Sequence, residues 1–457
     1  MRKILAAVAA ASLIGLALAS PGASTPVPEA VALDPITPRS PIENVVILYQ
    51  ENHSFDDTLG AVCNTRKTPC NGYTGPVRLA NGRRVDNKVQ PDISPFVLHT
   101  VEAQLLGMQN RWNRLAGCEA PKYLCITHVP QRRIPNLAAL AHKFALSDAS
   151  FASDPYASFG MHIALAAGTV GGFTGRNPVD SRTGAEPGPG WGCPSRKDVR
   201  WSSRRDAPER YVPACIPDRQ GQGPYRESPV PHMPTIMQRM EQAGKSWHIY
   251  QGNLRQRPSN GVWAVCTYFY WCEDNRFNLK HDSASRDFVA AARAGTLPNL
   301  SILLPIAGNS QHNHQSMTIG DNYVGRMVEA AMQGPDWDKT AIFIAYDDCG
   351  CFYDHVKPPA GLGLRQAVVM VSPWARRLYT DSTKAVQPYS MLAFLQHNFG
   401  LASLSAAVDR AYDYRRSFNF DKPVKALLPG IDMTTSRISQ AKRAKLAQLP
   451  DRVLDPW

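Results

Sequence analysis

The chain has 457 residues, of which 44% are hydrophobic and 19% are charged, so it can bury a large core and is neither a disordered segment nor a coiled coil. Its 32 glycines and 37 prolines predict long irregular loops between regular elements. The formal net charge of +12 would suit a polyanionic partner, but the basic residues form no runs interleaved with aromatic residues. Nucleic-acid binding is therefore not predicted.

The N-terminal residues have the pattern of a secretory signal peptide, which we predict at residues 1–24. Arg2 and Lys3 precede an apolar, alanine-rich stretch at residues 4–19, which ends on Ala-Leu-Ala and so offers small side chains at a cleavage site. A membrane anchor is the alternative, but the stretch is short for a bilayer span and lacks a stop-transfer flank. We expect a linker at residues 25–41 and a bacterial protein that is secreted or periplasmic, with no transmembrane segment in its mature chain.

Short apolar runs alternate along the rest of the chain with stretches of helical periodicity. This alternation predicts an α/β sandwich with a largely parallel sheet. Residues 42–457 are expected to form one domain, with an irregular insertion at about 171–231. In chain order, the predicted elements are a strand at 42–49, a helix at 137–142, a strand at 144–146, helices at 158–167 and 236–240, strands at 247–250, 300–304, 340–346 and 366–373, and a helix at 390–399.

The ten cysteines fall into five pairs that are close in sequence, an even number that suits an oxidising compartment. Zinc binding is the alternative, but no Cys-x-x-Cys pair occurs, and the single Cys-x-Cys pair is too tight for half of a zinc finger. We therefore expect disulfides. The simplest connectivity joins neighbours: Cys63 with Cys70, Cys118 with Cys125, Cys193 with Cys215, Cys266 with Cys272, and Cys349 with Cys351.

Polar residues follow two of the predicted strands at the point where each strand ends. Glu51 and Asn52 come after the strand at 42–49, and Asp347 and Asp348 come after a later strand. The ends of buried parallel strands are where α/β sheets place their sites. Carboxylate and amide oxygens are hard ligands, so the four side chains are candidates to bind a divalent cation. Each pair can equally be a helix cap or a solvated turn.

Ser158 lies at a loop-to-helix junction, where a hydroxyl can simply cap the helix. The same position gathers backbone N–H groups around an anion, which suits a nucleophile that accepts a phosphoryl group. Histidines also recur near polar turns, and most single histidines are structural. One or two of them could protonate a leaving alcohol or stabilise phosphoryl oxygens. The candidates are His99, His248, His312, His314 and His355.

Three long blocks resemble a known family. Residues 50–56, Gln-Glu-Asn-His-Ser-Phe-Asp, are followed by Gly60 and form the first block. The second block runs from Phe144 through Ser158 to Thr169, and the third covers residues 337–359. Together with smaller motifs in the same order, they are similar to the bacterial phosphoesterase family, which contains phosphatidylcholine-type phospholipases C and related secreted acid phosphatases. The match covers most of residues 42–172 and 233–420.

The resemblance implies an alkaline-phosphatase-like, three-layer α/β/α fold and one divalent metal ion of unspecified identity. It also implies that Ser158 is both the nucleophile, through a phosphoserine intermediate, and a metal ligand. His312 matches the family's histidine that protonates the leaving group, with His314 as the fallback. His99 matches a second histidine, and His248 is a looser candidate. By matching position the metal ligands are Glu51, Asn52, Ser158, Asp347 and Asp348.

The sequence departs from the family pattern in three places. The nucleophile is serine, as in the acid phosphatases, whereas the phospholipases have threonine. Gly-Met-His at residues 160–162 replaces the usual Pro-Asn-Arg, and Asp-Asp-Cys-Gly-Cys at residues 347–351 replaces Asp-Glu-His-Gly-Gly. The implied substrate is a phospholipid head group or a small phosphomonoester, with peripheral contact to a lipid surface in the first case. The alternative is a non-catalytic secreted binding protein on a decayed phosphoesterase scaffold.

Overall fold

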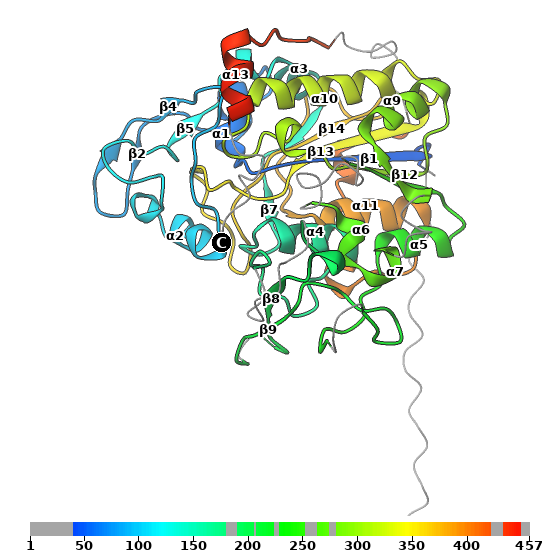
Figure 1. The fold of residues 1–457 in the computed structure, drawn as a ribbon. Helices are drawn as coiled ribbons and strands as arrows, with labels where there is room; N and C mark the ends of the chain where they lie inside the picture. Colours follow the sequence, from blue (N-terminus) through cyan, green and yellow to red (C-terminus); the bar gives the residue numbers. More distant parts are fainter. Residues whose placement is uncertain are drawn as a thin grey trace, which may run out of the picture. The chain divides into compact units, whose positions relative to one another are not determined.

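A large sheet forms the centre of the fold in the computed structural model (Figure 1). The structure describes residues 40–179, 190–204, 207–223, 228–251, 263–273, 280–421 and 433–448, all of which belong to the unit Ile36–Trp457. The predicted signal peptide at residues 1–24 lies outside the described residues, as does the predicted linker except for its last two positions. Within the described residues, no helix combines the length and apolar character that a membrane span requires.

The sheet has eight strands among the described residues, and most of them run parallel. The first five strands are mutually parallel, β14 is antiparallel to both of its neighbours, and β15 is parallel to β6. The largely parallel α/β fold predicted from the sequence is therefore confirmed. In spatial order the strands are β11 (Asp282–Ala284), β10 (Trp247–Gln251), β12 (Leu300–Leu303), β1 (Asn44–Gln50), β13 (Thr340–Tyr346), β14 (Val368–Val371), β6 (Ala145–Ser147) and β15 (Thr380–Asp381).

Helices cover both faces of the sheet and complete three layers (Figure 1). Every residue of β1 and β13 is buried, as expected for strands that have helices on both sides. One face carries α3 (Pro135–Lys143), α9 (Ser285–Ala294) and α10 (Met317–Met332), with α1 (Phe55–Cys63) beside α3. The other face carries α4 (Ser158–Ala167), α5 (Ile236–Gln242), α6 (Val265–Tyr268), α7 (Tyr270–Glu273) and α11 (Tyr389–Phe399).

The predicted strands and helices are all present, with ends displaced by at most two residues. The sequence did not predict α1, α9 and α10, nor the peripheral helices α2 (Val101–Met108), α12 (Ala406–Asp409) and α13 (Gln440–Gln448). Further short strands form small separate sheets: β2 (Val77–Arg78) with β3 (Arg84–Val85), β4 (Lys88–Val89) with β5 (Thr127–His128), and β7 (Ser150–Ala152) with β16 (Ala385–Gln387).

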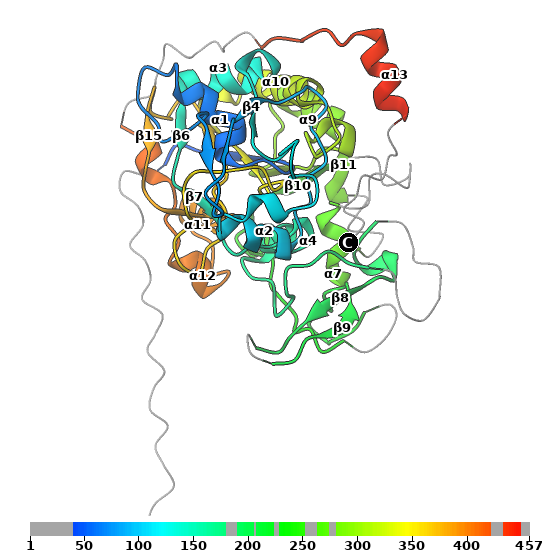
Figure 2. The ribbon, with the colours of Figure 1, turned by 90° about the vertical axis from the view of Figure 1, so that its left-hand side faces the viewer.

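The segment predicted as an irregular insertion contains an antiparallel pair of strands, β8 (Asp198–Trp201) and β9 (Arg210–Pro213). In both views this pair lies on the far side of α4 and α7 from the central sheet (Figures 1 and 2). The Cys193–Cys215 disulfide links two parts of this segment that are 22 residues apart. The other four neighbour pairs are also joined, so the predicted connectivity is confirmed.

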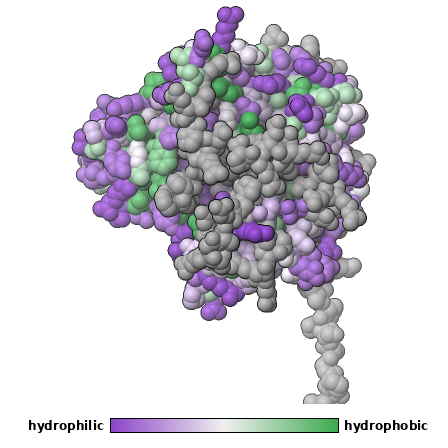
Figure 3. All heavy atoms as spheres, in the orientation of Figure 1, coloured by the Kyte–Doolittle hydropathy of each residue, from purple (hydrophilic) through white to green (hydrophobic). Residues whose placement is uncertain are grey.

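Hydrophobic side chains are rarely exposed over the described surface. The large ones that are exposed are Val89, Leu105 and Ile306. Among the described residues on the side drawn in Figure 3, hydrophilic residues predominate between hydrophobic patches. Single exposed apolar side chains are ordinary on protein surfaces, so these three residues do not define an apolar patch.

Candidate active site

The pairing of β1 with β13 brings the two acidic motifs together. Gln50 pairs with Tyr346, so the residues that follow, Glu51 and Asp347, are neighbours where the strands end. The Asp347 N–H donates to the Gln50 carbonyl at 3.0 Å, and the Asn52 N–H donates to Asp347 Oδ1 at 2.8 Å. All of these side chains are buried. The structure therefore rejects the solvated-turn alternative for both motifs.

The loop after β13 is held against the loop after β1 by a tight turn. Asn52 adopts a left-handed backbone conformation with φ of 61°, and Gly350 does so with φ of 64°. Asp348 Oδ1 accepts the Gly350 N–H at 2.7 Å, and a disulfide joins the residues on either side of Gly350. This disulfide packs with Val97 and Phe352 in a smaller hydrophobic cluster, and this packing holds the loop in place.

Ser158 is the first residue of α4 and faces the end of β1. Its side chain is buried, and its Oγ donates to Glu51 Oε2 at 3.3 Å. The helix N-cap is Ala157, which has no side-chain capping bond, so Ser158 does not serve as the cap. The hydroxyl predicted as a nucleophile therefore points from the start of α4 to the acidic cluster at the end of β1.

Two of the predicted histidines converge on Asn52. His99 Nε2 lies 3.1 Å from Asn52 Nδ2, and the rings of His99 and His312 are 5.2 Å apart. The Nδ1 atoms face the carbonyls of Val97 and Asn313 at 2.9 and 3.0 Å, so these nitrogens carry the protons. Each ring consequently presents Nε2 to the site.

The amide group of Asn52 separates the imidazoles from the carboxylates. Its second polar atom lies 2.8 Å from Asp348 Oδ1 and 3.1 Å from Asp347 Oδ1. With the nitrogen turned to the carboxylates, the amide donates to both of them, and its oxygen faces Nε2 of His99 and His312, which can donate to it only when the rings are protonated at both nitrogens. With the oxygen turned to the carboxylates, it adds to a group of oxygens whose mutual repulsion a bound cation would relieve.

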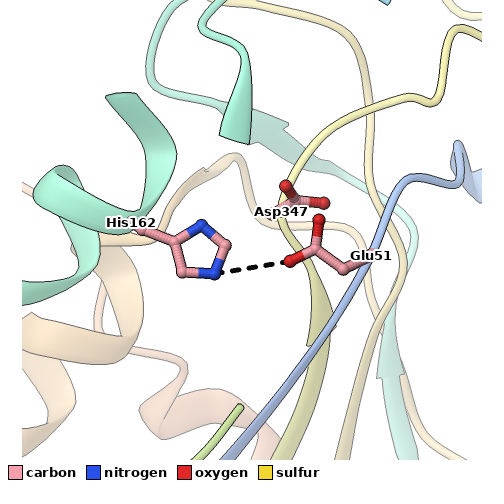
Figure 4. A group of neighbouring side chains, drawn as sticks. All are labelled: Glu51, His162 and Asp347. Atoms are coloured by element: carbon pink, nitrogen blue, oxygen red, sulfur yellow. Dashed lines mark ion pairs between the residues drawn. The ribbon is translucent and has the colours of Figure 1, made fainter. Parts of the chain in front are cut away.

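His162 joins the cluster although the sequence did not single it out as a ligand. It lies one turn after Ser158 on α4, is fully buried, and its Nε2 is 3.4 Å from Glu51 Oε1. Figure 4 shows its ring directed at Glu51 and Asp347. The signal available in the sequence is the spacing of four residues from Ser158, which places both side chains on one face of a helix.

The other three histidine candidates make different contacts: His355 with Asp56, His248 with Ser283 and His314 with Phe96. His248 is in β10 at the register of Ser301, which pairs with Val46, five residues before Glu51. That offset is roughly 16 Å along the strand, and His248 Nε2 contacts Ser283 Oγ at 2.8 Å instead. His314 packs against the Phe96 ring. The structure brings His99 and His312 to the cluster, whereas His248 lies away from it.

Two aromatic residues near the site were also missed by the sequence reasoning. The Trp263 ring centre lies 5.6 Å from that of His312. Tyr268 lies in α6, and burial together with the nearby charges of Glu51 and Asp347 raises the pKa of its hydroxyl well above the usual value. No local sequence signal identified either residue, because α6 is a single turn whose position depends on tertiary packing.

The electrostatics of the cluster fit a bound cation. Burial, and then the charge of Asp347, raise the pKa of Glu51 well above its ordinary value. Asp347 Oδ2 and His162 Nε2 are both buried and have no hydrogen-bond partner. Glu51, His162 and Asp347 offer one ligand atom each within 4.8 Å of one another. A divalent cation would satisfy these atoms and remove the repulsion between the carboxylates.

A second group of buried acidic side chains contains an arginine of its own. Buried Arg365 pairs with Asp56 at 2.9 Å and with Asp354 at 3.1 Å, and His355 Nδ1 lies 2.6 Å from Asp56 Oδ2. These contacts connect the start of α1 to the end of the third sequence block. In this group one guanidinium is shared between two buried carboxylates.

Comparisons with known proteins agree with the sequence motifs. A model of the phosphoesterase family matches residues 42–402. Phospholipase C A of Mycobacterium tuberculosis is 24% identical over 464 residues, which cover 85% of this chain and 79% of that protein. Non-hemolytic phospholipase C of Pseudomonas aeruginosa is 23% identical over 453 residues, with 86% of this chain and 59% of that protein covered. A solved structure from Vibrio parahaemolyticus, described as a protein in the alkaline phosphatase superfamily, aligns over 82% of this chain and 71% of that chain with 11% identity and a TM-score of 0.39.

Proposed function

Because the chain belongs to the phosphoesterase family, we propose that it is a secreted, metal-dependent hydrolase that uses Ser158 as its nucleophile. The reaction class follows from the family: the protein is an enzyme that hydrolyses phosphoester bonds. The observation that carries the proposed mechanism is the hydrogen bond from Ser158 Oγ to Glu51 Oε2, at the buried sheet edge where Asp347 also lies.

One divalent metal ion is part of the proposal. The unpartnered Asp347 Oδ2 and the crowding of carboxylates at the ends of β1 and β13 support it. When bound, the ion would lower the pKa of the serine hydroxyl and offset negative charge on the phosphoryl oxygens. The residues that would hold it are Glu51, Asn52, Ser158, Asp347 and Asp348.

In the first step Ser158 Oγ attacks phosphorus in line with the leaving oxygen. The bond between phosphorus and that oxygen breaks, and a phosphoserine forms. Glu51 Oε2 already accepts the hydroxyl's hydrogen bond, so the serine proton has an acceptor as the new bond forms. Positioning and charge neutralisation supply most of the rate enhancement in such reactions.

His312 protonates the departing alcohol in this mechanism. Its Nδ1–H is fixed by the Asn313 carbonyl, which leaves Nε2 as the atom that exchanges a proton with the substrate. His99 is held in the same way by the Val97 carbonyl and contacts the phosphoryl oxygens. Water then hydrolyses the phosphoserine, with His312 accepting the water proton, and Ser158 is regenerated.

The substrate belongs to one of two classes. The relatives' names point to phospholipids, whereas the serine nucleophile is the one that the family's acid phosphatases use. Among the described residues, the exposed large apolar side chains are single ones, which favours a phosphoester that arrives from water. We therefore propose a soluble phosphoester as the substrate. Export is supported by the five disulfides and by the signal peptide predicted at residues 1–24.

Hydrolysis assays test the proposal directly. The wild-type protein, Ser158→Ala and the exposed control Ser403→Ala would be assayed with p-nitrophenyl phosphate and with p-nitrophenylphosphorylcholine, from pH 4 to 9, with and without a chelator. We expect Ser158→Ala to reduce kcat by about 10³-fold or more, while Ser403→Ala retains wild-type rates. Near-normal hydrolysis by Ser158→Ala would show that the nucleophile is another residue.

The two substrates separate the remaining alternatives. Cleavage of the monoester that requires both the metal and Ser158 identifies a phosphatase. Preference for the choline diester identifies a phospholipase C. Absence of hydrolysis with either substrate, together with absence of bound metal, would favour the non-catalytic binding protein.

A further inference from the structure

We propose that His162 is a nitrogen ligand of the metal ion, so that the site prefers a cation of the Zn²⁺ class to Ca²⁺ or Mg²⁺. This inference rests on the proposed function only in assuming that an ion binds at the ends of β1 and β13. It changes the character of the site, because the ligands implied by the sequence motifs are all oxygen atoms.

The first argument is the orientation of the ring. His162 Nδ1 lies 2.8 Å from the Ser158 carbonyl, one helical turn earlier, so Nδ1 carries the proton and donates it. The lone pair is then on Nε2, which points away from the helix backbone towards Glu51 (Figure 4). Metal-binding histidines are typically fixed by such a hydrogen bond from the second ring nitrogen.

The second argument is the separation of the ligand atoms. Nε2 lies 3.4 Å from Glu51 Oε1, and these two atoms lie within 4.8 Å of an Asp347 oxygen. Ligand atoms about 2.1 Å from a shared tetrahedral ion are about 3.4 Å apart. The spacing therefore allows both atoms to bind one ion.

The third argument is the lack of any other partner. Nε2 is completely buried and makes no hydrogen bond, although it is close to Glu51 Oε1. Asp347 Oδ2 is likewise buried and makes no hydrogen bond. A buried polar atom without a partner is costly, and two such atoms in one cluster need a common partner. An ion bound between them provides it.

The ligand set determines which cation binds best. Oxygen-only sites suit Ca²⁺ and Mg²⁺, whereas imidazole nitrogen suits Zn²⁺ and other first-row transition metals. His162 occupies the position at which the family motif has arginine. An arginine at this position would repel the metal ion. A neutral histidine removes that positive charge and adds a nitrogen ligand.

Calorimetric titration of the chelator-treated protein tests this assignment. Wild type, His162→Gln and His142→Gln would each be titrated separately with Zn²⁺ and with Ca²⁺, and circular dichroism would check their folding. His142 is the matched control because it is a partly exposed histidine on α3 that contacts Gln131. We expect His162→Gln to weaken Zn²⁺ binding at least tenfold and Ca²⁺ binding less than threefold, and His142→Gln to change neither. An unchanged ratio of the two affinities in His162→Gln overturns the assignment.

Diffraction from zinc-loaded wild-type crystals gives a second test that needs no variant. An anomalous zinc peak about 2.1 Å from His162 Nε2 supports the assignment, and a peak surrounded only by oxygen atoms overturns it. Neither experiment involves a substrate. Zinc binding that depends on His162 without hydrolysis would contradict the proposed function alone, and hydrolysis without such binding would contradict this inference alone.

Discussion

Gly350 packs so closely against Asn52 that a β-carbon on Gly350 would lie 2.0 Å from the Asn52 carbonyl oxygen. The contact joins the two loops that carry the acidic residues. Both residues have positive φ, and Gly350 also donates its N–H to Asp348 Oδ1. The distance between the loop of Asn52 and the loop of Asp347 and Asp348 therefore depends on the absence of a side chain at position 350.

The variant Gly350→Ala should separate these two loops. We expect it to lower the free energy of unfolding by about 3 kcal/mol or more, since strain at positive φ adds to the overlap with the Asn52 backbone. Metal affinity should fall as well. Chemical denaturation and metal titration would measure the two effects.

Gly361→Ala is the matched control. Gly361 has φ of 80° and no heavy atom near its β-carbon position, so alanine there should cost only the conformational strain of about 1 kcal/mol. Metal affinity should not change. Equal losses of stability and metal affinity in the two variants would contradict the role of the close contact.

The variant His312→Asn should reduce hydrolysis most for poor leaving groups. If His312 protonates the departing alcohol, we expect kcat for an alkyl phosphate to fall by about 10²- to 10⁴-fold, because an alkoxide leaves slowly without a proton. The loss for p-nitrophenyl phosphate should be much smaller, since p-nitrophenolate leaves without one. Steady-state kinetics on both substrates would check this.

His314→Asn tests the alternative assignment within the same loop. His314 packs against Phe96, so its replacement should not change the ratio of the two rates. A leaving-group effect that appears in His314→Asn and not in His312→Asn would exchange the two assignments.

The third prediction concerns His248, which we expect to affect acid stability and not catalysis. Burial, followed by the charge of His281, lowers its pKa to about 4. The unfolded chain, with a histidine pKa of about 6.5, then binds more protons between pH 6.5 and 4, so the folded state loses stability as the pH falls through that window. His248→Gln removes this component.

Urea denaturation at pH 7 and pH 5 would measure the effect. The difference in unfolding free energy between the two pH values should be smaller for His248→Gln than for wild type. The pH profile of hydrolysis should be the same in both proteins. A shifted profile in the variant would return His248 to the list of catalytic candidates.

Some elements were not predicted from the sequence because their residues are suited to tertiary contacts and not to the local helical propensity. The helix α10 contains Gly320 and Gly325, which weaken its helical signal. A β-carbon on Gly320 would lie 2.2 Å from the Gln311 side chain, and one on Gly325 would lie 2.6 Å from Asn136. These glycines permit close packing, which local propensity cannot indicate.

The sequence by itself determined the features that depend on neighbours along the chain. Apolar runs predicted β1 and β13, and the family motifs identified Glu51, Asp347 and Ser158 before any geometry was known. The disulfide pairs were also local. Each of these features depends on residue type and on short spacing, which the chain sets directly.

Only the tertiary structure decided which histidines approach the acidic cluster. Spacing along the chain does not specify the distance between loops, which depends on strand register and on the close contact at Gly350. Those contacts bring His99 and His312 to Asn52, leave His248 near the start of β10, and turn His162 Nε2 towards Glu51. A histidine acquires its chemistry from the atoms that surround it, and here those atoms come from segments far apart in the sequence.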